Sequence, residues 1–136
     1  MEDLTVPADC NNGIAYASCS GTVAGSWITS SGLGRAVLWD AAGGSRVLPV
    51  SVPVLSAMAR GLNADGWVVG MQSTAALQSR YFGTLWFQGN VYKLEQLVEP
   101  GLDVRISSAS AVNAAGQIVC EGLLEGRPRA MRLDPR

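Results

Sequence analysis

Apolar residues occur along this chain in short runs, and residues that favour tight turns separate the runs. The clearest pattern is an apolar residue, Asn, two small residues, Gly and a second apolar run, at 62–70 and again at 112–120. A weaker copy occupies 17–25. Asn side chains hydrogen-bond the nearby backbone, and Gly takes the positive φ that such turns need. The pattern therefore predicts a β-hairpin at each of the three copies.

The turn glycines, Gly21, Gly66 and Gly116, recur about every 45–50 residues, a period that is typical of repeat architectures. After its hairpin, each copy continues with a polar loop and a third apolar strand, and the first two copies add a second tight turn and a fourth strand. The third strands are predicted at 36–39, 83–86 and 130–133, and the fourth strands at 46–48 and 92–94. Such a unit has the size of one propeller blade.

The chain is therefore predicted to be all-β and to form a single repeat domain of β-propeller-like units over residues 1–136. The units are approximately 7–50, 51–97, and 98–136 plus 1–6. Residues 1–6 are assigned to the last unit because the third copy lacks a fourth strand and the N-terminal sequence resembles that of 47–50. We expect the N-terminal strand to complete the last blade, which would hide an exposed sheet edge.

Three blades are fewer than the four to eight of an ordinary closed propeller. We therefore expect a half-ring that forms a homodimer with six blades, because two-fold dimers are the commonest assembly. The same period also fits one third of a β-trefoil or β-prism, in which one chain closes on itself as a monomer. Another all-β sandwich is the remaining alternative.

The block N-x-x-G-x-[VI]-V-G, followed by a short block of the H-A-F-L-W type, resembles the HAF repeat, which occurs in tandem in bacterial proteins. The match is best at 94–97, 109–120 and 129–135 and covers nearly all of the chain. The resemblance implies a propeller-like fold and an extracellular setting, and it brings no catalytic residues. The histidine that names the repeat is absent, and its positions hold Arg35, Phe82 and Arg129.

Composition indicates an ordered domain with an apolar core, since 48% of the residues are hydrophobic and 15% are charged. The net charge of −1 argues against a nucleic-acid partner, and the chain has no apolar run of about 18 residues that would span a membrane. The acidic start of the chain is unlike a signal peptide. The protein is expected in the cytoplasm if Met1 is the native start, and outside it or in the periplasm if a leader was removed.

The chain contains no histidine, which removes Ser-His-Asp and Cys-His nucleophiles and the commonest metal ligand. The three cysteines lack C-x-x-C spacing, so neither a zinc site nor any other cofactor is expected. Whether Cys10 and Cys19 pair stays open. One enzymatic alternative remains, a small hydrolase that acts on saccharides with a pair of carboxylates. The candidate acids are Glu95, Glu99, Asp103, Glu121 and Glu125.

A non-catalytic binding or protein-interaction module is the leading hypothesis, with a saccharide or a protein as its ligand. Trp67 shares its repeat position with Thr22 and Gln117, so its side chain is expected either at the surface, where it would bind a ligand, or packed between sheets. Trp27, Tyr81 and Phe82 are expected in the variable loops after the second strands, where repeat scaffolds place function.

Two further candidates are basic. Arg35 and Arg129 occupy equivalent positions in the first and third copies. If the copies are arranged around an axis, these arginines would lie at one end of the molecule and could hold an anionic group.

Overall fold

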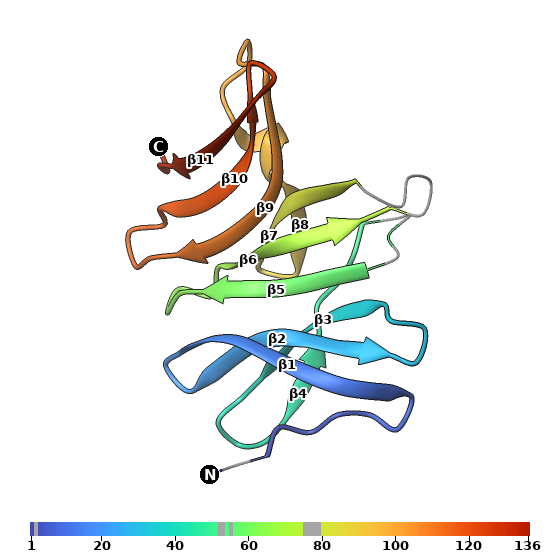
Figure 1. Ribbon diagram of the computed structural model, residues 1–136. Helices are drawn as coiled ribbons and strands as arrows, with labels where there is room; N and C mark the ends of the chain where they lie inside the picture. The colour runs from blue at the N-terminus through green and yellow to red at the C-terminus, as the bar shows by residue number, and fades with distance from the viewer. Residues whose placement is uncertain (2, 52–53, 55, 75–79) are drawn as a thin grey trace.

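The computed structural model describes residues 1, 3–51, 54, 56–74 and 80–136. In this part of the chain, strands form three antiparallel sheets (Figure 1). Sheet 1 contains β1 (Cys10–Cys19), β2 (Thr22–Thr29), β3 (Gly34–Trp39) and β4 (Ser45–Val47). Sheet 2 contains β5 (Ser56–Leu62), β6 (Val68–Ser73), β7 (Tyr81–Phe87) and β8 (Asn90–Lys93). Sheet 3 contains β9 (Val104–Val112), β10 (Ile118–Leu124) and β11 (Arg127–Leu133), and the 3-10 helix η1 (Leu94–Leu97) precedes it.

The prediction of an all-β chain is confirmed, and each sheet is a meander whose neighbouring strands follow one another in sequence. All three hairpins form at the predicted places, because Gly21, Gly66 and Gly116 take φ values of 81°, 83° and 76°. The Asn63 side-chain oxygen accepts hydrogen bonds from the backbone N–H groups of Asp65 and Trp67, at 3.1 and 3.0 Å. Such local bonds are how Asn specifies a turn.

The three sheets lie one after another, with an apolar core in each of the two gaps between them (Figure 1). The middle sheet separates the other two, and its first strand β5 packs against sheet 1 on one side and against β9 on the other. Sheets 1 and 3 stand at opposite ends of the row, so the row is open. The alternative of a monomeric β-trefoil or β-prism is therefore wrong, because it requires the first and third units to meet.

The prediction that the N-terminal strand completes the last blade is also wrong within this chain. Sheet 3 contains only β9, β10 and β11 among the described residues, and the N-terminus lies at the opposite end of the molecule (Figure 1). The segment 3–7 instead covers the outer face of sheet 1. Trp27 and Trp39 both donate their indole N–H groups to the carbonyl oxygen of Thr5, at 3.1 and 2.9 Å.

The sequence likeness between this segment and 47–50 has a different structural meaning. Trp86 of sheet 2 stands at the repeat position of Trp39, and it donates its indole N–H to the carbonyl oxygen of Pro49 at 2.6 Å. Pro49 belongs to the linker after β4. The N-terminal segment therefore takes the place of an inter-sheet linker, and the likeness does not mark a fourth strand.

Candidate ligand-binding cleft

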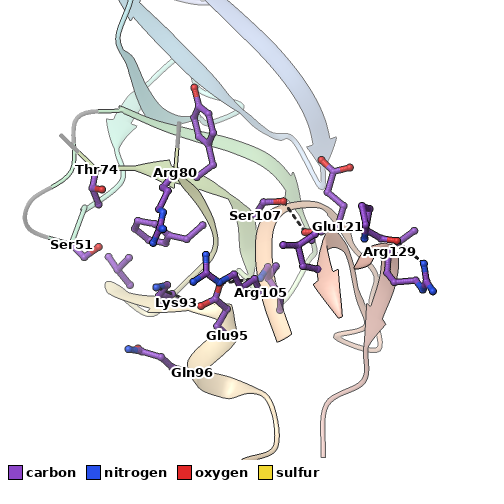
Figure 2. A pocket seen from close by; sticks show the side chains of 18 residues that line it. Ser51, Thr74, Arg80, Lys93, Glu95, Gln96, Arg105, Ser107, Glu121 and Arg129 are labelled. Carbon is purple, nitrogen blue, oxygen red and sulfur yellow. Dashed lines mark hydrogen bonds and ion pairs between the residues drawn. The ribbon is translucent and has the colours of Figure 1, made fainter. Parts of the chain in front are cut away.

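A cleft of about 1120 Å³ opens between sheets 2 and 3 at the end of the sheets where β7 begins (Figure 2). We call it the inter-sheet cleft. Ile106, which is fully buried in the core between these sheets, also lines it. The polar and charged lining residues are Ser51, Thr74, Arg80, Lys93, Glu95, Gln96, Arg105, Ser107, Glu121 and Arg129, and the two aromatic ones are Tyr81 and Phe82.

Lys93 is held in place by two neighbours on its wall of the cleft. Its ammonium group lies 5.3 Å from the centroid of the Phe82 ring and 3.5 Å from a carboxylate oxygen of Glu95. A cation over an aromatic face is attracted by the quadrupole of the ring, and the attraction grows as water is excluded. The strands β7 and β8 bring these residues together, since Lys93 pairs with Thr84, two residues after Phe82. The result is a fixed cation beside a flat apolar ring.

Glu95 links the two walls of the cleft. One carboxylate oxygen accepts a hydrogen bond from the backbone N–H of Ile106 at 3.0 Å, and the other contacts Lys93. The carboxylate thereby ties η1 to β9. Both oxygens of Glu95 thus have structural partners.

The hydrolase alternative requires two acids that face one another across a substrate. Glu95 and Glu121 both line the inter-sheet cleft, but Figure 2 shows the Glu121 side chain directed away from Glu95. Glu121 lies on β10 with its side chain exposed, next to Cys120, whose side chain faces sheet 2. These two carboxylates therefore do not face one another across the inter-sheet cleft.

Three arginines of the inter-sheet cleft have no carboxylate within salt-bridge distance among the described residues: Arg80, Arg105 and Arg129. Figure 2 shows Arg80, Lys93 and Arg105 gathered in the middle of the cleft and Arg129 at its far edge. With Glu95 and Glu121 as its only acids, the lining of the described cleft has an excess of positive charge. Its surface is therefore suited to an anion.

Three of the residues predicted from the sequence line this cleft, but two of them lie in a strand where a loop was expected. Tyr81 and Phe82 begin β7 and do not lie in a loop, because the strand starts earlier than the apolar pattern indicates. Both line the cleft, and Tyr81 is 44% exposed. Arg129 of β11 lines the cleft from sheet 3.

Two other predicted site residues are not brought to the cleft. Trp27 lies within β2, is 7% exposed and packs edge-on against Trp39 at 6.3 Å, so its expected place in a surface loop is wrong. Arg35 lies on β3 of sheet 1 and pairs with Asp9 at 3.1 Å. Since sheets 1 and 3 stand at opposite ends of an open row, Arg35 and Arg129 do not form a ring at one end of this chain.

Trp67 is half-buried, between the two settings expected for it. Its ring packs against Phe87 with the centroids 5.7 Å apart, and it lies over the turn glycine Gly116 of the next sheet. It also lines a smaller cleft of about 620 Å³ at the C-terminal end of sheet 3, beside Leu97 and Pro135. The packing of Trp67 across two sheets makes it chiefly a structural residue.

The residues that sequence reasoning missed are Arg80, Lys93 and Arg105. Lys93 is the only lysine of the chain, and its position on a fourth strand suggests only a solvated side chain. Arg105 offered a usable signal, because it stands between Val104 and Ile106 on a strand of otherwise apolar and small residues. The convergence of these side chains depends on how sheets 2 and 3 pack, which no local pattern reports.

Comparison with protein-family models, with curated proteins and with solved structures finds no match for this chain. The resemblance to the HAF repeat therefore stays a prediction. Within the described residues, no group of three or more Cys, Asp or Glu side chains is placed to hold a metal ion. The same part of the chain contains no helix with the length and hydropathy needed to cross a membrane.

Proposed function

We propose that this protein is a non-catalytic binding module whose ligand is an anionic saccharide held in the inter-sheet cleft. The observation that supports the proposal is the gathering of Arg80, Lys93 and Arg105 beside the aromatic side chains of Tyr81 and Phe82. Arginine matches a carboxylate with two parallel N–H donors, and a lysine adds a point charge. An unpaired guanidinium at a cleft wall is ready to form such a pair.

The aromatic residues define the rest of the ligand. Ligand sites combine apolar and aromatic surface with a few polar groups that fix orientation. The exposed Tyr81 ring and the Phe82 ring under Lys93 offer flat apolar surface to the C–H face of a sugar. Ser51, Thr74 and Gln96 add neutral hydrogen-bonding groups for hydroxyls. A sugar that bears a carboxylate, such as a hexuronic acid, combines the two features.

For the architecture, we propose that the three sheets are consecutive blades of an open propeller-like arc. Two observations support this proposal. Each sheet is a meander that begins with its first strand at one edge, and the first strands β1, β5 and β9 are neighbours in the row. The first strands of propeller blades surround a central channel in this order.

Calorimetric titration tests the ligand assignment. Trigalacturonic acid is compared with the neutral galactose trisaccharide, and we expect binding of the acid that weakens at higher salt. Arg105→Gln and Lys93→Gln should each raise the Kd at least about tenfold, since each removes a charged hydrogen-bond donor. The matched control is Arg35→Gln, an exposed arginine of sheet 1 outside the cleft. Equal binding of both sugars, absence of binding, or an equal loss in the control would contradict the proposal.

A further inference from the structure

The gap between sheets 1 and 2 shows which residues of each sheet face its neighbour. Ala24 and Leu38 of sheet 1 share one buried cluster with Val68 and Trp86 of sheet 2. We call the side of a sheet that faces the next sheet in sequence its leading face, and the opposite side its receiving face. In this first gap, Ala24 and Leu38 are on a leading face and Val68 and Trp86 are on a receiving face.

The gap between sheets 2 and 3 uses the same repeat positions. Val69 and Leu85, which correspond to Ala24 and Leu38, pack in one cluster with Ile118 and Leu133 of sheet 3. Ile118 and Leu133 correspond in turn to Val68 and Trp86. Because both gaps are built from equivalent residues, the mode of packing is a property of the repeat itself.

The leading face of sheet 3 has no sheet against it. Val119 and Arg132 stand at the positions that Val69 and Leu85 occupy in sheet 2. Since side chains alternate along a strand, and Ile118 and Cys120 face sheet 2, Val119 faces outward. It is 48% exposed. Val69, the equivalent residue of sheet 2, is completely buried, whereas Val119 is open to solvent.

The receiving face of sheet 1 is likewise without a neighbouring sheet, although the segment 3–7 crosses it. The equivalent linker does not prevent packing in the first gap, where Pro49 accepts the Trp86 bond and its neighbour Leu48 is buried between sheets 1 and 2. Val47 pairs with Val37, which packs beside Trp39 on this face. Val47 is nonetheless 49% exposed and Val6 is 38% exposed.

The two ends of the chain also differ in charge. Residues 1–47, which contain sheet 1, include four acidic residues and two arginines, whereas residues 104–136, which contain sheet 3, include five arginines and three acidic residues. Unlike charges favour contact between a sheet 1 end and a sheet 3 end and disfavour contact between two equal ends. The difference belongs to the two ends as a whole and not to single faces, since Arg129 lines the inter-sheet cleft and Glu121 stands on the same side of β10 as Val119.

We infer that the partner of both end faces is a second copy of this chain, with the leading face of sheet 3 in one copy packed on the receiving face of sheet 1 in the other. Each copy has one face of each kind, so two copies make this contact twice and leave no end face unpaired. A contact between unlike faces gives a closed assembly only when its rotation returns to the start. The inference is independent of the ligand in the inter-sheet cleft.

Light scattering on a size-exclusion column, over a dilution series, tests the assembly. We expect a mass of twice the 14.2 kDa of the chain. Val119→Glu on sheet 3 and Val47→Glu on sheet 1 should each give a monomer. Both side chains are exposed, so circular dichroism should show the fold unchanged. The matched control is Leu97→Glu, on a 54% exposed side chain of η1, and this variant should remain a dimer.

Three results would overturn the inference. A wild-type protein that is monomeric at every concentration has no such contact, and one that forms species larger than a dimer does not close with two copies. If only one of the two substitutions dissociates the dimer, the contact joins the same end face of both copies. Dissociation by both substitutions, with the control intact, is the result that only a contact between the two unlike faces produces.

Discussion

The indole N–H of Trp39 donates a 2.9 Å hydrogen bond to the carbonyl oxygen of Thr5. Trp86, at the same position of the second repeat, makes the corresponding bond to Pro49. In both repeats, a tryptophan of the third strand thus fixes the segment that precedes the first strand of its sheet. The bond explains why the N-terminal segment stays on sheet 1, although the sequence likeness to 47–50 suggested a strand for sheet 3.

Replacing each of these tryptophans by phenylalanine should show how much each of the two hydrogen bonds contributes to stability. Trp39→Phe leaves Thr5 with the second donor, Trp27, whereas Trp86→Phe removes the one indole donor to Pro49 that the structure describes. A lost hydrogen bond of this kind costs about 0.5–1.5 kcal/mol. Both variants also remove ring volume from a buried site, and this cost is common to the two. In urea denaturation, we therefore expect Trp86→Phe to lose more stability than Trp39→Phe, by about 0.5–1.5 kcal/mol. A larger loss for Trp39→Phe would contradict this assignment.

Asn63 should contribute more to stability than Asn113, although both specify the same turn. The Asn63 amide also donates to the carbonyl oxygen of Asn113 at 2.9 Å, so it joins sheet 2 to sheet 3. Asn63 is only 6% exposed, whereas Asn113 is exposed at the surface. We expect a loss of about 2–3 kcal/mol for Asn63→Ala and about 1 kcal/mol for Asn113→Ala. Equal losses in the two variants would show that the inter-sheet bond contributes nothing.

Gly70 should not tolerate a side chain. A Cβ at this position would overlap the carbonyl oxygen of Met58 on the neighbouring strand, and backbone cannot move as a flexible side chain can. Gly70→Ala should therefore cost about 1–3 kcal/mol. In Gly44→Ala, the three atoms nearest to the added Cβ all belong to the Asp40 carboxylate, which is a side chain, so that variant serves as the control and should lose less. Thermal unfolding of both variants decides whether the close approach at Gly70 is required.

The Cys120 thiol should make the free energy of unfolding fall as the pH becomes alkaline. Burial, together with the adjacent Glu121 carboxylate, raises the pKa of this thiol from 9.0 to about 11. The unfolded chain then loses the proton at lower pH than the folded chain. The stability that Cys120 contributes is complete below pH 9 and declines as the pH rises toward 11.

The measurement is urea denaturation of the wild type and of Cys120→Ala between pH 8 and pH 11. The wild type should be the more stable protein at pH 8, because Cys120 packs in the core between sheets 2 and 3. The difference between the two proteins should shrink as the pH rises from 9 to 11. A difference that stays constant over this range would mean that the thiol titrates equally in the folded and unfolded states.

The parts of the fold that sequence predicts well are those that adjacent residues determine. The turns at Gly21, Gly66 and Gly116 follow from local hydrogen bonds and from the freedom of glycine at positive φ. The third strands follow from apolar runs, although β3, β7 and β11 all start before the predicted residue. Strand ends are set by pairing with a neighbour, which an apolar pattern does not report.

The site was predictable only in part, because it depends on contacts between repeats. Phe82 was predicted from a variable loop expected after the second strand and Arg129 from its repeat position, and both line the inter-sheet cleft. Trp27 was predicted from the same kind of loop as Phe82, but it lies on the outer face of sheet 1 and is buried under the segment 3–7. Position along the repeat therefore did not distinguish a site residue from a core residue, because packing between segments decides which it becomes.

The central claim is that an anionic sugar binds between sheets 2 and 3, and backbone NMR tests it most directly. Trigalacturonic acid is added to the ¹⁵N-labelled protein, and the amide signals that move are assigned. We predict that the largest shifts belong to Phe82, Lys93 and Arg105, whose side chains line the cleft from both sheets. Shifts confined to sheet 1 or to the surroundings of Trp67, or no shifts at millimolar sugar, would contradict the account.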